Sequence, residues 1–445
     1  MTAPTRMRTA DLPGSYEAWG WVARALSAAA ILAVAGGCSD DNAGAPPHSH
    51  HHHEDGGHSH DDAAGHAHDD GGTPVYDGGP PPDGSVIGDF QWNLPPGFPL
   101  PAVPTTNPMS VEKVELGRHL FHDTRLSDNQ TQSCASCHEQ RFAFADARAR
   151  AVGSTGITHP RSSMSLTNVA YTSTLTWGHP LMNELERQAE APLLGDQPVE
   201  LGLKSLAQIE ERLRPVTRYH ELFAAAFPGE AQPITAANTL RALATFERTL
   251  ISGRSPYDRF LYQGQSDALS ESAKRGYQLF NAEKFECFHC HTSFNLSDHT
   301  NYEGKAFVEM PFHNTGLYNI GGTGAYPAPN TGAHSVTGNP SDMGKFKAPS
   351  LRNIAVTAPY MHDGSIATLS EVLDHYAAGG RRITSGPHAG DGNLNPLKDR
   401  LIRKFDMTEQ ERADVLAFLE SLTDQEFLTN PAFSDPWTAV AAPAH

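Results

Sequence analysis

Cysteine is scarce in this chain, with five residues among 445. Five cysteines are too few for a disulfide-stapled scaffold, so the fold must depend on a hydrophobic core. Basic residues are also in the minority, with 33 Lys and Arg against 51 Asp and Glu and a formal net charge of −18. This excess of negative charge repels phosphates, which argues against binding to nucleic acid or to an anionic membrane surface.

Apolar runs long enough to cross a membrane are missing from the N-terminal region. The apolar run at 26–34 follows three arginines, is too short to span a bilayer, and has the length of a signal-peptide core. We therefore expect residues 1–37 to be an export signal, and the protein to reach the periplasm or cell envelope. The sequence A-G-G-C ending at Cys38 resembles a lipoprotein signal, in which the cysteine is acylated and anchors the chain to the membrane; the alternative is a cleaved signal with a spare thiol.

Residues 38–85 form a low-complexity arm of His, Asp, Gly and Pro. Nine histidines fall between His48 and His68, interleaved with acidic residues, and almost nothing apolar is present to pack. We expect this arm to be disordered. Imidazole beside carboxylate suits Cu²⁺ or Zn²⁺, so the arm predicts weak capture of such ions, with a merely solvated tether as the alternative.

Beyond the arm the pattern is helical. Apolar residues recur at helical spacing in two places, Leu240, Leu243, Phe246 and Leu250, then Val415, Leu416, Leu419 and Leu422. Thr408 and Glu411 form a capping box ahead of the second stripe. Residues 314–342 are rich in Gly, Pro and Asn and predict a long functional loop.

Four cysteines lie in two identical frames, C-A-S-C-H at 134–138 and C-F-H-C-H at 287–291. In C-x-x-C-H the thiols lie one helical turn apart, where they can add to the two vinyl groups of one haem, and the next histidine meets the iron. A zinc site or a disulfide is the alternative, but two such frames in a cysteine-poor chain favour haem. The prediction is two haem c groups anchored by Cys134, Cys137, Cys287 and Cys290, with His138 and His291 as proximal iron ligands.

One domain per haem is the economical division. We expect a mainly α fold with two cytochrome c-like haem domains packed together, at 86–255 and 256–430, behind the disordered arm. Two haems suit either an electron wire or a site where one haem reacts and the other supplies electrons. An iron with six ligands transfers electrons, whereas one with an open position binds peroxide, so the distal ligands decide.

The order of further motifs resembles the bacterial dihaem cytochrome c peroxidase and MauG superfamily over about residues 90–425. Trp177 and L-E-R-Q at 185–188 follow the first frame, and A-P-S-L-R-N at 348–353 and T-A-P-Y-M-H-D-G at 357–364 follow the second. The stretches at 92–98 and 161–166 are most similar to MbnH, the methanobactin-associated MauG-like dihaem enzymes.

The resemblance implies that the His138 haem is the peroxide site and that Gln188, Pro192 and Glu200 form its catalytic pocket. A carboxylate is chemically apt there, because splitting the O–O bond requires a proton to move between the two oxygens. Glu200 lies two residues further along than is usual in the family, and without the resemblance it would be interpreted as a surface acid.

The resemblance also assigns Trp177 as an electron relay between the haems, against the alternative of a core tryptophan. Thr368 and Glu371 form a capping box that predicts a helix through Tyr376. Tyr376 lies seventeen residues after Pro359, where the superfamily has the distal ligand of the second haem: methionine in ordinary peroxidases and tyrosine in MauG-like enzymes. A core aromatic is the alternative for Tyr376.

Met361 is a rival for the same ligand position, but it belongs to the P-Y-M-H-D-G turn. The family also binds Ca²⁺ between the haems, which implies a site at Thr357, Pro359 and Ser162, although Ser162 replaces the usual asparagine. His159 precedes a proline and lies out of register with the histidine that blocks the first haem in ordinary peroxidases. We therefore interpret His159 as structural and the iron on His138 as open.

These features predict an enzyme that reacts with hydrogen peroxide, stores high-valent oxidising equivalents on two haems, and oxidises a partner protein by long-range electron transfer. By family analogy the substrate is a tryptophan of a small exported copper-binding, MbnP-like protein. An ordinary peroxidase fed by a small cytochrome or cupredoxin is the first alternative. A non-catalytic electron carrier or copper-sequestering lipoprotein is the second.

Overall fold

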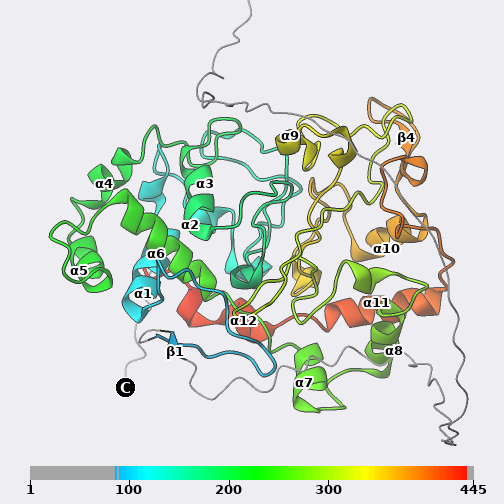
Figure 1. Ribbon diagram of the computed structural model, residues 1–445, viewed down its shortest axis with the longest axis horizontal. Coiled ribbons are helices and arrows are strands. Elements are labelled where there is room, and N and C mark those ends of the chain that lie inside the picture. The colour runs from blue at the N-terminus through cyan, green and yellow to red at the C-terminus, as the bar shows by residue number, and fades with distance from the viewer. Residues whose placement is uncertain (1–85, 88–89, 438–445) are drawn as a thin grey trace, which may run out of the picture. The chain divides into compact units, whose positions relative to one another are not determined.

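The computed structural model describes residues 86–87 and 90–437, all of which belong to one unit spanning 72–445. Its regular structure is mainly helical, as predicted (Figure 1). The strands form two antiparallel pairs, β1 (Val86–Ile87) with β2 (Phe90–Gln91) and β3 (Arg382–Ile383) with β4 (Gly390–Asp391). The predicted export signal, Cys38 and the histidine-rich arm lie outside the described residues.

The helices follow in chain order, separated by long loops and single 3₁₀ turns. They are α1 (Val111–Phe121), α2 (Leu185–Gln188), α3 (Glu190–Leu194), α4 (Ala207–Leu213), α5 (Thr217–Ala226), α6 (Ala236–Arg248), α7 (Pro256–Gln263), α8 (Glu271–Phe280), α9 (His334–Thr337), α10 (Leu369–Ala377), α11 (Glu409–Glu420) and α12 (Gln425–Thr429). None of the helices in the described ranges is long and apolar enough to cross a membrane.

The expected stripes and capping boxes are confirmed in α6, α10 and α11. Thr368 accepts a hydrogen bond from the backbone N–H of Glu371, and Thr408 does the same for Glu411, so each caps the first turn of its helix. The predicted loop at 314–342 is confirmed except for the single turn of α9 and one 3₁₀ turn.

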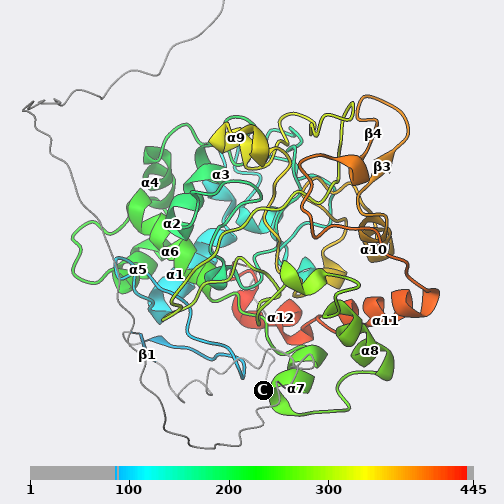
Figure 2. The ribbon, with the colours of Figure 1, turned by 45° about the vertical axis from the view of Figure 1, so that its right-hand side comes forward.

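We call the part of the unit up to α6 the N-terminal half and the part from α7 to α11 the C-terminal half. Each half is built on one pair of packed helices, α1 with α6 and α8 with α11 (Figures 1 and 2). A glycine permits the close approach in both pairs. A Cβ on Gly117 of α1 would lie 2.0 Å from the carbonyl oxygen of Ala242, and one on Gly276 of α8 would lie 1.9 Å from that of Asp414. Any side chain there would push the helices apart.

The aromatic packing beside each glycine is repeated as well. Phe121 contacts Phe246 with ring centroids 5.2 Å apart, and Phe280 contacts Phe418 at 5.1 Å. All four rings are buried, and they lie in the two main hydrophobic clusters. The two halves therefore share one helix-pair framework, a structural repeat that the sequence patterns did not predict, while the expected domain division at 86–255 and 256–430 stays a prediction.

Two asparagines tie a loop of each half to the end of its last long helix. Asn168 and Asn353 have φ of 57° and 60°, the left-handed conformation that asparagine tolerates, and each starts a 3₁₀ turn. Their backbone N–H groups donate to the carbonyl oxygens of Leu250 and Leu422, at 2.8 and 3.0 Å.

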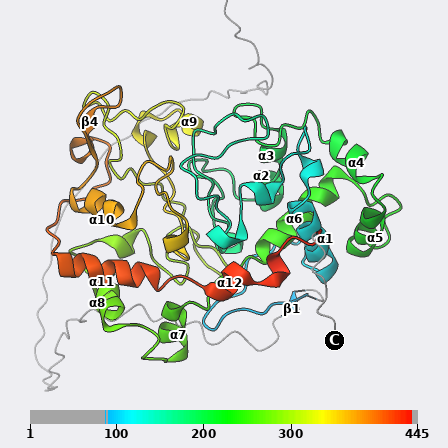
Figure 3. The ribbon, with the colours of Figure 1, turned by 180° about the vertical axis from the view of Figure 1, so that it is seen from behind.

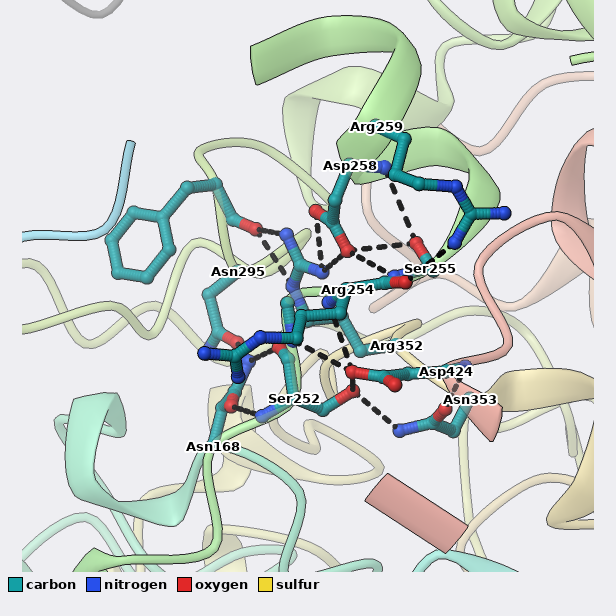
Figure 4. A network of polar contacts seen from close by, with 12 residues as sticks. Asn168, Ser252, Arg254, Ser255, Asp258, Arg259, Asn295, Arg352, Asn353 and Asp424 are labelled. Atoms are coloured by element: carbon teal, nitrogen blue, oxygen red, sulfur yellow. Dashed lines mark hydrogen bonds and ion pairs between the residues drawn. The ribbon is translucent and has the colours of Figure 1, made fainter. Parts of the chain in front are cut away.

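The halves meet at a buried polar joint (Figure 4). Asp424, just after α11, accepts hydrogen bonds from Ser252 Oγ and from the backbone N–H groups of residues 253 and 254. Arg352 pairs with Asp258 of α7 at 2.9 Å. The chain then crosses back through α12, and Phe427 enters the core of the N-terminal half (Figure 3).

Candidate functional site

Both C-x-x-C-H frames fold as single tight turns. The 3₁₀ turns at Cys134–Ser136 and Cys287–His289 carry the frames, and their four cysteines are free thiols. Burial, followed by the nearby carboxylates of Asp146 and Glu200, raises the pKa of Cys137 to about 11, and burial raises that of Cys287 to about 12. The Cys137 and Cys287 thiols are therefore held in the protonated form, which suits thioether anchors better than a structural zinc site.

The two histidines that follow these turns have the same second contact. The Nδ1 atom of His138 lies 2.8 Å from the carbonyl oxygen of Phe144, and that of His291 lies 3.2 Å from the carbonyl oxygen of Leu296. A carbonyl accepts the hydrogen on Nδ1, so Nε2 keeps its lone pair for a metal. Burial also lowers the pKa of both imidazoles, which keeps them in the neutral, ligating form.

A cavity of about 450 Å³ lies beside the second frame. Its walls are largely apolar and include Cys287, Cys290 and His291, so the thiol pair and the neutral imidazole open into one space. Such a cavity, thiol pair and imidazole fit a covalently attached haem.

Two candidate distal ligands line the same cavity, Tyr376 from α10 and Met361 from the loop before it. Burial raises the pKa of the Tyr376 phenol well above its ordinary value, and within the described residues no hydrogen bond is made by its oxygen. A bound ferric ion acts in the opposite direction, because a nearby positive charge favours the phenolate. The structure brings Tyr376 and His291 to one cavity, and which side chain binds iron stays a prediction.

Trp177 stands in the wall between this cavity and a second one of about 90 Å³. Its indole Nε1 donates to the carbonyl oxygen of Ser162 at 3.1 Å, and its own carbonyl accepts the N–H of Lys347 at 2.9 Å. Burial lowers the pKa of Lys347 to about 7, so this ammonium group in the wall is only partly charged near neutral pH. Trp177 is thus fixed at two points between the cavities, as a relay position requires.

The second cavity is lined by all three residues of the expected calcium site, Ser162, Thr357 and Pro359. The Ser162 hydroxyl donates to the carbonyl oxygen of Met361 at 3.2 Å. The described residues therefore bring this oxygen-rich set together, as the family resemblance implied, while Ca²⁺ binding stays a prediction.

The three pocket residues expected at the first haem also lie close together. Gln188 ends α2, Pro192 lies in α3, and the chain after Glu200 returns alongside α3 because the Leu201 N–H donates to the carbonyl oxygen of Pro192 at 2.9 Å. The Glu200 side chain is 44% exposed, and its Oε1 lies 3.4 Å from Nε2 of His159. His159, expected to be structural, thus contacts the expected catalytic carboxylate.

Sequence reasoning missed a charged cluster beside the second frame. His313 lies between Asp298 and Asp399, with each ring nitrogen 2.7 Å from a carboxylate oxygen. Burial alone would lower the pKa of His313, but hydrogen bonds to the two aspartates outweigh it and raise the pKa to about 12. No signal in the sequence links these residues, which lie 15 and 86 positions apart.

Known proteins match this chain along most of its length. Residues 111–267 match the family model described as di-haem cytochrome c peroxidase. The chain is 36% identical over 321 residues to methylamine utilization protein MauG of Methylorubrum extorquens, covering 72% of this chain and 80% of that protein. It is 35% identical over 367 residues to cytochrome-c peroxidase IdrP1 of a Pseudomonas species, covering 78% of this chain and 92% of that protein.

Solved structures agree with these relatives. A MauG-like protein associated with microbial copper homeostasis is 52% identical, with a TM-score of 0.76, and the match covers 78% of this chain and 99% of that one. The diheme peroxidase BthA of Burkholderia thailandensis, at 20% identity, a TM-score of 0.56 and coverage of 77% and 99%, supports the fold. The chain therefore belongs to the dihaem cytochrome c peroxidase and MauG family, peroxide-dependent oxidoreductases that carry two c-type haems.

Proposed function

We propose that this protein uses hydrogen peroxide to oxidise a side chain of a small exported copper-binding protein, by electron transfer through the wall that contains Trp177. The observation that carries the proposal is the placement of Tyr376 in the cavity of His291, with Trp177 in its wall. The 52% identity to a MauG-like protein associated with microbial copper homeostasis supports the choice of partner. A tryptophan of that partner is the substrate residue.

Each residue has a separate task in this proposal. Haem bound at the two frames supplies the redox chemistry with peroxide. Glu200 accepts a proton from the near oxygen of peroxide and returns it to the departing oxygen, while Gln188 and Pro192 shape the pocket. Tyr376 would hold the second iron through its phenolate, which would favour the oxidised form, whereas a thioether would favour the reduced form.

The partner does not need to enter a pocket, because electrons leave through Trp177. We include in the proposal a Ca²⁺ ion at Ser162, Thr357 and Pro359, export to the periplasm or envelope, acylation of Cys38, and Cu²⁺ or Zn²⁺ capture by the histidine-rich arm. Capture of Cu²⁺ by the arm agrees with a role in copper homeostasis. None of these parts is needed for the peroxide chemistry.

An ordinary cytochrome c peroxidase is the second candidate. It is favoured by Met361, which lines the same cavity as His291, because a thioether ligand suits a haem that receives electrons from a small cytochrome or cupredoxin.

Mass spectrometry of the partner tests the proposal. The purified holoenzyme is incubated with peroxide and a candidate partner, the protein encoded beside it. Addition of oxygen to a partner tryptophan is expected. If the partner stays unmodified while peroxide is still consumed, the result would contradict the proposal and support an ordinary cytochrome c peroxidase. Glu200→Gln is the control: both haems stay attached, but the absorbance change on adding peroxide slows by ~100-fold or more, a typical value of general acid–base help.

A further inference from the structure

The loop that contacts the Glu200 segment is a small hairpin with a histidine near its end. The backbone pairs residue 151 with 159 and 152 with 158, and the turn closes through a hydrogen bond from Gly153 to Ile157 at 2.9 Å. Pro160 follows His159 and restricts the backbone on that side. The position of His159 is therefore set by backbone hydrogen bonds.

The hairpin is bound to the segment that carries Glu200. The Ser154 N–H donates to the carbonyl oxygen of Glu200 at 2.7 Å, and the Ser154 hydroxyl donates to that of Leu201 at 3.2 Å. A Cβ on Gly153 would lie 1.9 Å from the carbonyl oxygen of Val199, so only glycine permits this approach. These contacts, most of them made by the backbone, thus hold His159 and Glu200 in register.

The tautomer of His159 follows from a second contact of its ring. The backbone N–H of Arg161 donates to Nδ1 of His159 at 3.0 Å, so Nδ1 acts as an acceptor. A neutral imidazole with an acceptor at Nδ1 carries its hydrogen on Nε2. That hydrogen is on the nitrogen that lies 3.4 Å from Oε1 of Glu200.

We propose that His159 is a positioning residue for Glu200: it donates from Nε2 to the carboxylate and orients it toward the site of the His138 haem. The proposal rests on the proposed role of Glu200. A distance of 3.4 Å is long for a hydrogen bond, but such contacts are often long without substrate and shorten when it binds. A half-exposed pair adds little to stability, so an effect on chemistry is the expected signature.

Cyanide provides a probe that needs no turnover. Hydrogen cyanide is a weak acid that binds ferric haem as the anion, so a nearby base must take its proton. The association rate of cyanide with the His138 haem therefore reports proton acceptance by Glu200. We expect His159→Ala to slow both cyanide association and the absorbance response to peroxide by ~10-fold or more, the size typical for loss of an orienting partner.

A set of variants separates positioning from other roles. His159→Gln places an amide donor where Nε2 lies and should restore most of both rates. His159→Ala added to Glu200→Gln should cause no further loss, because the histidine acts through the carboxylate. His179→Ala is the matched control, since Nδ1 of His179 likewise accepts the N–H two residues on, at 3.3 Å, but the described structure shows no carboxylate paired with it.

The outcomes are distinct. Unchanged rates in Glu200→Gln would overturn the proposed function of Glu200 itself. Slow rates in Glu200→Gln with unchanged rates in His159→Ala would overturn only the positioning role. A His159→Gln variant as slow as His159→Ala would also overturn it, because the ring would then be needed for more than a hydrogen bond. Melting temperatures of all variants close to wild type would exclude misfolding as the cause.

Discussion

The buried ion pair at the joint between the halves gives a quantitative test of the fold. The Arg352 side chain is 0% exposed and that of Asp258 is 1% exposed. The other contacts of the guanidinium are neutral: the carbonyl oxygen of Phe294 and the ring of Phe98, whose centroid is 4.7 Å away. Asp258→Asn therefore keeps the shape but leaves a buried cation without its counter-charge.

The expected loss of unfolding free energy is ~3–5 kcal/mol, the usual cost of removing one partner of a buried pair. That corresponds to a change of more than about a hundredfold in the unfolding equilibrium constant. Guanidinium titration followed by circular dichroism measures it, with haem content checked by absorbance. Asp374→Asn is the matched control, because Asp374 pairs with Arg412 at 2.6 Å but is 58% exposed. This control should lose only ~0–1 kcal/mol.

A double variant tests whether the unpaired charge of Arg352 causes the loss of stability. Asp258→Asn combined with Arg352→Met removes the unpaired charge, and it should recover a large part of the lost stability. The reasoning would be refuted if Asp258→Asn were no more destabilising than Asp374→Asn. It would also be refuted if the double variant were less stable than Asp258→Asn alone.

Three further predictions concern the haem ligand, acid stability and the arm. Tyr376→Phe should abolish the low-spin ferric signal of the His291 haem in electron paramagnetic resonance, whereas Met361→Leu should retain it; the reverse pattern would contradict the ligand assignment. Burial lowers the pKa of His299 to about 3, so only the unfolded state takes up this proton between about pH 6.5 and pH 3. The stability that neutral His299 contributes is thus fully present above pH 6.5 and is lost on acidification, on the order of a few kcal/mol. The melting temperature of His299→Gln should therefore fall less steeply with decreasing pH than that of the wild type. Deleting residues 48–68 should leave haem content and peroxide reactivity unchanged but remove Cu²⁺ uptake measured by calorimetry, and equal uptake would falsify the metal role.

Local patterns in the sequence predicted local structure well. The capping boxes at Thr368 and Thr408 each depend on four consecutive residues, and both are present. The C-x-x-C-H frames likewise fold as the expected turns, because five adjacent residues contain the whole geometry. These features need no information about the rest of the chain.

Contacts between distant segments were not predictable from one sequence. His159 and Glu200 are 41 residues apart, and Arg352 and Asp258 are 94 apart. Nothing in the identity of these residues indicates the pairing, since His159 beside a proline is equally typical of a structural loop. The tautomer of His159 depends on a backbone N–H, which has no signature in the sequence.

The repeated helix pair has a consequence for how this family can change. Gly117 and Gly276 fix the same helix crossing in both halves, so the framework tolerates little variation at these points. The segment between each frame and the last long helix takes no part in this crossing. In one half this segment carries Glu200, and in the other it carries Tyr376. Gene duplication followed by changes confined to these inserts would be enough to produce two haem sites with different chemistry from one ancestral module.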